Sequence, residues 1–298
     1  MALGIGVLIT ERMSAALVAD NGIIGKVLQR PEEDSYVDSL HSVPLESIVQ
    51  WIVDMVGELK IEVAPSVLGL GIPGLVRNGV VEDSPNLVQF KGTNMQALIS
   101  EALALKFPKL SVSIFNDADV MAAGIAAKHG HLDRLIRVWT LGTGIGYGRY
   151  PFAPGVWEAG HSIVSLDPKE QFCACGGKGH LEGIMGQRAM RLRFMDLEPE
   201  EIFQHAAEGD TRCIEFVKLW HRALAAGTAT SIHYDGPGKF FITGFNSRYV
   251  NLTLLNEYLH EMVKLSPLQG YQTEIVPGGE SVAVVGAVVN AFQALERC

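Results

Sequence analysis

The chain has little basic charge and no long apolar run. Among 298 residues there are 24 Lys and Arg against 33 Asp and Glu, which gives a formal net charge of -9. An acidic chain without a basic block is a poor candidate for binding nucleic acid through phosphate neutralisation. No apolar stretch reaches the length of a membrane span, and Glu11 and Arg12 interrupt the apolar start, so we expect neither a membrane segment nor a signal peptide. These absences predict a cytoplasmic protein with no nucleic-acid or membrane partner.

Charged residues are scarce as well, at 19% of the chain, whereas 48% of the residues are apolar. This balance argues against intrinsic disorder and allows a sizeable buried core. The length fits one large domain or two domains of ordinary size.

Cysteine is also scarce: the four are Cys173, Cys175, Cys213 and Cys298. The first two lie in FCACGGKGH, one residue apart, which is too close for a relaxed disulfide between them. With His161 and His180 they form a set of two cysteines and two histidines among glycines, and this set predicts a tetrahedral zinc site. Four protein ligands would make the zinc structural, closing a loop rather than activating water. The alternative is that the histidines are ordinary polar surface residues.

Strands and helices alternate along the chain. Apolar runs predict strands over 1–10, 13–20, 22–30, 66–76, 110–117 and 239–245, and a strand, glycine turn and strand over 134–152. Helical spacing or composition predicts helices over 45–59, 93–107, 118–130, 251–265 and 281–295, with further helix within 187–231. Because the pattern occurs in both halves, we expect two similar α/β lobes with ligands at the carboxyl ends of the strands.

Two segments at predicted strand ends could carry chemistry. LGTGIGYG (141–148) has glycines that permit positive φ and close approach, so its amides and the Thr143 hydroxyl could bind phosphate; the alternative is a simple hairpin turn. Asp117, after the strand that ends in FND, is placed for a general base, although an aspartate there could equally cap the next helix. Glu158 and Glu182 flank the predicted metal loop and could bind sugar hydroxyls or be solvated surface charges.

Together, these motifs resemble the ROK family of repressors and sugar kinases, in order and over most of the chain. GIPGLVRNGVVEDSPNL, FNDAD, LGTGIGYG, EAGH, CACGGKGHLE, FFITGF and VVGAVV each resemble a family segment. The resemblance implies an α/β fold of two actin-like (ribonuclease H-like) lobes with a central cleft, of the hexokinase/ROK type. The N-terminal lobe would span 1–117 and be joined by the C-terminal helix at about 283–298, and the second lobe, with the zinc loop, would span 118–282.

The resemblance also implies roles for individual residues. Asp117 would be the general base that takes the proton from the sugar hydroxyl. Sugar hydroxyls would be held by Asn86, Asn116, Glu158, His161 and Glu182. Gly142, Thr143 and Gly144 would lie against the nucleotide phosphates and Gly244 near the adenosine. Structural zinc would be bound by His161, Cys173, Cys175 and His180, and Mg·ATP would be the phosphate donor. The family resemblance favours a homodimer.

One motif of the family is missing. Where the family has its first phosphate loop, D-x-G-G-T, this chain has Val7-Leu8-Ile9-Thr10-Glu11. Bulky side chains would obstruct a phosphate and Glu11 would repel it. Two smaller departures are His180 at the position of a cysteine and Asp119 at that of an asparagine.

Two functions therefore follow. The first is ATP-dependent phosphorylation of a hexose or amino sugar. The second is a catalytically impaired sugar-binding or regulatory protein on the same fold, which the altered loop favours. We do not expect the DNA-binding repressor branch, since the strand pattern begins at once and no basic recognition helix is left over.

Overall fold

The computed structural model describes residues 3–10, 12–31, 40–153, 155 and 158–297. Contacts divide the chain into two units. The first comprises Met1–Ile136, Gly148–Val156 and Gly278–Cys298, and the second comprises Arg137–Tyr147 and Trp157–Pro277.

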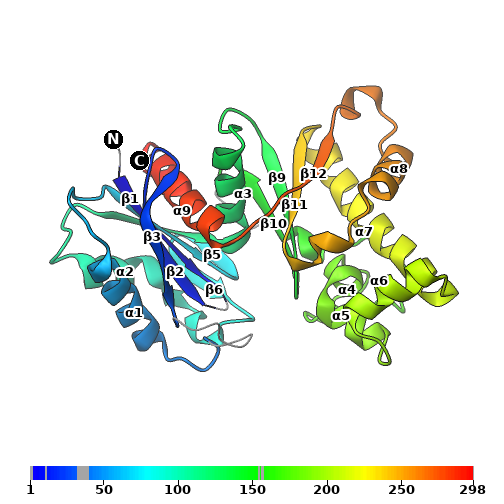
Figure 1. The fold of residues 1–298 in the computed structure, drawn as a ribbon, viewed down its shortest axis with the longest axis horizontal. Helices are drawn as coiled ribbons and strands as arrows, with labels where there is room; N and C mark the ends of the chain where they lie inside the picture. The colour runs from blue at the N-terminus through cyan, green and yellow to red at the C-terminus, as the bar shows by residue number, and fades with distance from the viewer. Residues whose placement is uncertain (1–2, 11, 32–39, 154, 156–157, 298) are drawn as a thin grey trace. The chain divides into compact units, whose positions relative to one another are not determined.

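The first unit is built on a five-stranded sheet with the order β3-β2-β1-β4-β8 (Figure 1). β1 pairs antiparallel with β2 and parallel with β4, so the opening meander continues into a parallel sheet. The strands are β1 (Leu3–Ile9), β2 (Met13–Ala19), β3 (Gly22–Arg30), β4 (Val67–Ile72) and β8 (Ser111–Asn116), with a small sheet of β5 (Leu75–Arg77), β6 (Val80–Asp83) and β7 (Thr93–Asn94). The three predicted opening strands are confirmed.

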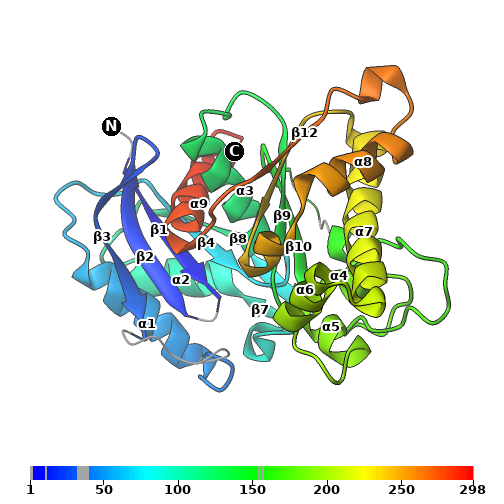
Figure 2. The ribbon, with the colours of Figure 1, turned by 45° about the vertical axis from the view of Figure 1, so that its right-hand side comes forward.

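Helices cover both faces of this sheet. The helices are α1 (Leu45–Glu58), α2 (Met95–Leu103), α3 (Asp117–Lys128) and α9 (Glu280–Leu295). On one face, α1 buries Ile48, Ile52 and Met55, spaced at helical intervals, in a cluster that also contains α2 residues. On the other face, α9 and α3 pack side by side against the sheet (Figure 2). Strands buried on both faces explain why β1 and β2 are almost continuously apolar.

Small residues let α3 and α9 approach closely. A Cβ on Gly286 would overlap the carbonyl oxygen of Val120, and one on Gly124 would overlap that of Val282. This packing groups α3 with the first contact unit. The lobe boundaries that the family resemblance implies, 1–117 with about 283–298 and then 118–282, stay a prediction.

The second unit is built on a four-stranded sheet with the order β10-β9-β11-β12. The strands are β9 (Ile136–Leu141), β10 (Ile145–Tyr150), β11 (Lys239–Thr243) and β12 (Gln272–Ile275). The helices are α4 (Glu182–Met185), α5 (Gln187–Arg193), α6 (Pro199–Glu208), α7 (Thr211–Asp235) and α8 (Leu252–Met262). Their core contains Trp139, Trp220 and Phe240, all fully buried.

The region 187–231, expected to be helical, is interrupted twice. Helix α5 ends before Phe194, and α6 ends at Gly209, whose φ of 101° suits glycine. The Asp210 side chain then accepts a hydrogen bond from the Cys213 amide and caps α7. The helix predicted over 93–107 is also shorter in the structure, where α2 begins at Met95 and ends at Leu103.

Candidate active site and metal centre

The predicted base lies at the junction of β8 and α3, in the first unit. Asp117 is the first residue of α3, and the cap is Asn116, whose side-chain oxygen accepts from the Ala118 amide at 2.8 Å. The N-cap of α3 is therefore Asn116 and not Asp117, for which capping was the alternative role. The Asp117 carboxylate still accepts from the same amide at 3.0 Å. Burial raises the pKa of Asp117 in spite of this hydrogen bond, which makes its carboxylate a stronger base.

The expected sugar ligands of the first unit differ in their surroundings. The Asn116 amide nitrogen donates to the Gly74 carbonyl oxygen at 2.9 Å, so this side chain holds the turn after β4 as well as capping α3. Gly74 needs to be glycine, because its φ is 118° and a Cβ would collide with the Asp83 carbonyl. Asn86 is exposed in the segment that follows β6.

An ordinary hairpin replaces the family's first phosphate loop. β1 pairs with β2 along its whole length, and the Thr10 amide donates to the Arg12 carbonyl oxygen at 3.0 Å. Val7, at the position of the expected aspartate, is fully buried in the core. Glu11 lies outside the described residues.

A polar cluster that the sequence did not reveal lies beside this hairpin. Glu280, at the start of α9, accepts from Arg12 at 2.5 Å, from Ser14 at 2.6 Å and from Gln29. Burial alone would raise the pKa of Glu280, but the hydrogen bonds from these three partners outweigh it and lower the pKa. The cluster therefore joins the residue before β2, β2 itself and β3 to α9 through one charged carboxylate.

The predicted glycine turn, residues 142–145, joins β9 to β10 in the second unit. Gly142 and Gly144 do not use the positive φ that glycine permits. Gly144 instead lies close to Glu182, since a Cβ there would be 2.6 Å from a carboxylate oxygen of Glu182 and would displace that side chain. The Gly142 amide donates to the Gly144 carbonyl oxygen. Among the described residues, no acceptor faces the amides of Thr143 and Gly144, which leaves them available to an anion.

The neighbouring strand end lies against this turn. Gly244 follows β11 with a φ of 91°, and a Cβ there would lie 2.5 Å from the Leu141 carbonyl oxygen. Asn246 is fully buried, donates to the Gly142 carbonyl oxygen at 3.0 Å and accepts from Gln187 at 3.1 Å. Sequence reasoning missed Asn246 and Gln187. The only available signal was that Asn246 is a polar residue directly after the buried strand predicted over 239–245.

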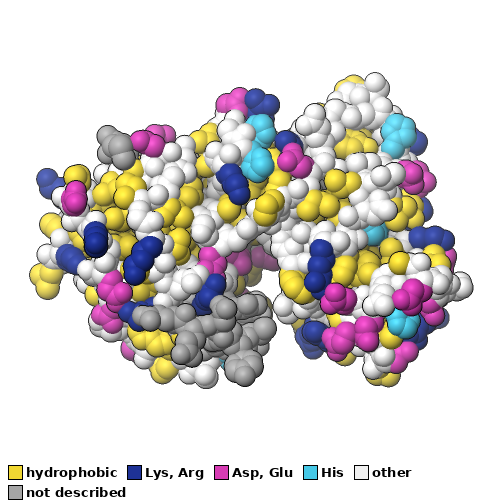
Figure 3. Space-filling view, in the orientation of Figure 1, with side chains coloured by type: hydrophobic (Ala, Val, Ile, Leu, Met, Phe, Trp, Pro, Cys, Tyr) yellow, Lys and Arg dark blue, Asp and Glu magenta, His cyan; other side chains and the backbone are white. Residues whose placement is uncertain are grey.

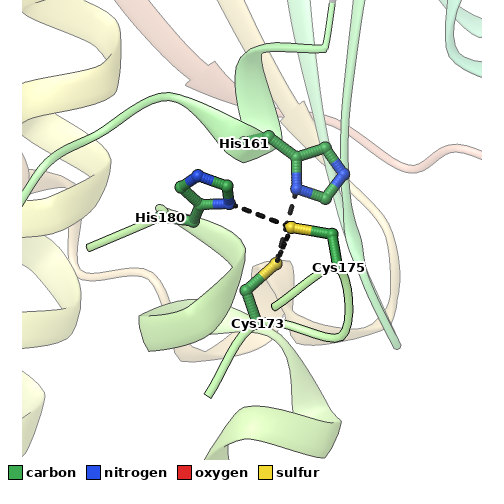
Figure 4. A group of neighbouring side chains, drawn as sticks. All are labelled: His161, Cys173, Cys175 and His180. Carbon is green, nitrogen blue, oxygen red and sulfur yellow. Dashed lines mark hydrogen bonds between the residues drawn. The ribbon is translucent and has the colours of Figure 1, made fainter. Parts of the chain in front are cut away.

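The four predicted metal ligands come together in the second unit. Their nitrogen and sulfur atoms all lie within 4.8 Å of one another and point toward a common centre (Figure 4). Cys173 Sγ lies 3.4 Å from His161 Nδ1 and from Cys175 Sγ, and Cys175 Sγ lies 3.3 Å from His180 Nδ1. Zinc binds sulfur at about 2.3 Å and nitrogen at about 2.0–2.1 Å, so tetrahedral ligands lie roughly 3.3–3.8 Å apart. The donor set and the three pairs at 3.3–3.4 Å therefore fit a zinc ion, while any pair wider than about 3.8 Å in this set would have to draw closer to bind it.

Two members of this cluster differ in how their protonation bears on metal binding. Burial and the neighbouring His161 lower the pKa of His180, which favours the neutral imidazole that a metal needs. Burial, with contributions from Cys175 and Glu182, raises the pKa of the Cys173 thiol to about 12. A zinc ion would have to displace that proton.

The two glutamates expected as sugar ligands have different partners. Glu158 is exposed, with Oε2 3.9 Å from His161 Nε2. Glu182 Oε2 accepts from the Ile145 amide at 3.0 Å, and its Oε1 lies 3.6 Å from Cys173 Sγ. Glu182 is thus held by the glycine turn and the metal cluster.

A model of the ROK family matches residues 27–268, which is most of the chain. The chain belongs to the ROK family. It is similar to a protein named glucokinase from Pyrobaculum calidifontis, with 28% identity over 99% of this chain and 97% of that protein.

Solved structures of the family share the fold. A ROK hexokinase from Thermus thermophilus has a TM-score of 0.78 at 20% identity, covering 99% of this chain and 100% of that one. A ROK glucokinase from Streptomyces griseus, solved with glucose and AMPPNP, has a TM-score of 0.70 at 21% identity, covering 98% and 100%. The expected actin-like, hexokinase/ROK-type α/β fold is therefore confirmed.

On the face seen in Figure 3, basic side chains are interspersed with acidic ones. Of the helices in the described part of the chain, none combines the length and the apolar character that crossing a bilayer needs.

Proposed function

We propose that this ROK protein is an ATP-dependent sugar kinase that uses Asp117 as its general base. The observation that carries the proposal is the Asp117 carboxylate at a strand end, with its pKa raised by burial, in a chain whose relatives are named as sugar kinases. A hexose or amino sugar is the acceptor, and Mg·ATP is the donor.

The reaction needs little covalent chemistry from the protein. The Asp117 carboxylate accepts the proton of the attacking sugar hydroxyl while the oxygen forms its bond to the γ-phosphorus and ADP leaves. A carboxylate with a raised pKa is better matched to this task than an ordinary aspartate. Magnesium enters with ATP and neutralises phosphate charge.

The remaining residues bind and orient the substrates. Asn86, Asn116, Glu158 and His161 are proposed to hold sugar hydroxyls; Glu182 is proposed to do so only through the oxygen that does not bind Ile145. The free amides of Thr143 and Gly144 are proposed to bind nucleotide phosphate, with Gly142 completing the turn and Gly244 near the adenosine. His161, Cys173, Cys175 and His180 are proposed to hold a structural zinc ion, which supplies a cross-link that closes the loop.

A coupled ADP-release assay tests the proposal. Mg·ATP would be combined with a panel of hexoses and N-acetylhexosamines, with Asp117→Asn as the blank. Turnover with one sugar that the variant loses would support the kinase and identify the acceptor. Equal rates for Asp117→Asn and the wild type would rule out the proposed base. The expected homodimer stays a prediction, which light scattering after gel filtration would check.

A second candidate function rests on the hairpin that replaces the first phosphate loop. Buried Val7 cannot orient magnesium, and Arg12 is engaged by Glu280. Both features favour a sugar-binding or regulatory protein that does not turn over. Sugar binding by calorimetry without ADP release would select this function.

A further inference from the structure

The glycine turn is held mainly by residues of the metal-binding segment, 158–187, which we call the metal loop. The Ile145 amide donates to Glu182 Oε2 at 3.0 Å, and the Gly142 carbonyl oxygen accepts from the Gln187 amide at 3.3 Å. The Ile145 carbonyl faces Gly160, where a Cβ would overlap its oxygen. Both ends of the turn therefore depend on the position of the metal loop.

Glu182 is the shortest physical link between the turn and the metal cluster. It opens α4, two residues after His180, and its two oxygens face different partners. Oε2 binds the Ile145 amide, while Oε1 lies 3.6 Å from the ligand Cys173. The carboxylate lies against Gly144, since a Cβ on that residue would be 2.6 Å from Oε2.

We propose that Glu182 is a positioning residue through which the metal centre holds the glycine turn in its phosphate-binding conformation. This inference rests on the proposed function, because it assigns the turn to the phosphate donor. It differs from the role that the family resemblance gives to Glu182, since the side chain acts on the nucleotide side. When the metal fixes Cys173 and His180, α4 is fixed, and the amides of Thr143 and Gly144 stay aligned for an anion. Metal removal then weakens donor binding even without sugar.

Hydrogen exchange tests the coupling without any mutation. Wild-type protein loaded with zinc would be compared with protein treated with a chelator, by exchange mass spectrometry of peptides that span 141–147. We expect faster exchange at the Ile145 amide after metal removal, together with faster exchange in the metal loop. Faster exchange in the metal loop with unchanged exchange at 141–147 would overturn the proposal.

Binding experiments test the role of the carboxylate. ADP binding without sugar would be measured by calorimetry for zinc-loaded wild type, Glu182→Ala and Glu182→Gln, with zinc content checked in each. A hydrogen bond to a charged group contributes about 1.5–3 kcal/mol, so Glu182→Ala should weaken ADP binding roughly 10- to 100-fold. Glu182→Gln keeps an acceptor for the Ile145 amide and should recover part of the affinity. If Glu182→Ala does not fold, the loss of ADP affinity in Glu182→Gln tests the proposal in its place.

Asp167→Asn is the matched control, because Asp167 is an exposed carboxylate of the same loop and the asparagine keeps the oxygen that accepts from the Lys169 amide. It should leave ADP binding unchanged. Unchanged ADP affinity in zinc-loaded Glu182→Ala, with weaker sugar binding, would overturn the proposal in favour of a sugar ligand. A wild type that binds no nucleotide would count against the proposed function, and the exchange experiment would still decide whether metal and turn are coupled.

Discussion

Replacing Glu280 by alanine should destabilise the first unit by removing the carboxylate that joins α9 to β2 and β3. Glu280 accepts from Arg12, Ser14 and Gln29, which lie 251 to 268 positions away in the sequence. The substitution leaves three donors without their acceptor. It also removes a negative charge from the N-terminus of α9, where acidic residues are favourable.

The magnitude follows from the hydrogen bonds and their exposure. A hydrogen bond to a charged group contributes about 1.5–3 kcal/mol when buried. The Arg12 and Glu280 side chains are 27% and 23% exposed, so solvent screening reduces that value. Counting roughly 1 kcal/mol for each of three bonds, we expect a loss of about 2–4 kcal/mol in the free energy of opening. Glu280→Gln, which keeps one oxygen, should lose about half as much.

Native-state hydrogen exchange of peptides from β1, β2 and the start of α9 measures this opening free energy in the unit concerned. Glu215→Ala is the control, since it breaks an exposed ion pair with Lys218 in α7 and should have no measurable effect. Because the folded-state pKa of Glu280 is lowered, its contribution is present in full above the ordinary value of 4.5 and disappears as the pH falls through the folded-state pKa. A loss below about 0.5 kcal/mol at pH 7 for Glu280→Ala would refute the reasoning, because such values are usual for surface substitutions.

Three further predictions concern the metal, pH and helix packing. Cys175→Ser should release zinc and weaken sugar binding, measured by metal analysis and calorimetry; unchanged sugar affinity in metal-free protein would contradict a loop closed by zinc. His221 is buried, and its Nε2 accepts from the Asn251 amide at 2.8 Å. Burial lowers the pKa of His221, so its stabilising effect is complete above the ordinary value of 6.5 and falls as the pH decreases below it. The urea midpoint should therefore be lower at pH 5.5 than at pH 7.5, and a His221→Gln variant with the same pH dependence would exclude this cause. Gly286→Ala places a methyl group against the Val120 carbonyl and should destabilise the protein by about 1–3 kcal/mol or more, which a wild-type melting temperature would contradict.

Local pattern in the sequence predicts most of the elements around the site. The apolar runs locate β8 and β9, and the residues that follow them, Asp117 and Gly142, lie at those strand ends. The His/Cys cluster is also accessible from sequence, because cysteines at 173 and 175 with histidines nearby in a short glycine-rich segment are typical of a zinc site. Breaks within 187–231 are harder to predict, since a cap such as Asp210 is recognised only when its amide partner is known.

What the sequence by itself determined is the ROK family, the succession of strands and helices and the four members of the His/Cys cluster, because each is recognised from short segments of the chain. Tertiary structure alone decided the partners of Glu280 and Glu182, and the link from Asn246 to the Gly142 carbonyl. These contacts join segments that are distant in sequence, and a side chain's hydrogen-bond partners depend on how the elements pack. The same physical reason explains why a glutamate in a family motif could be recognised from sequence while its hold on the glycine turn could not.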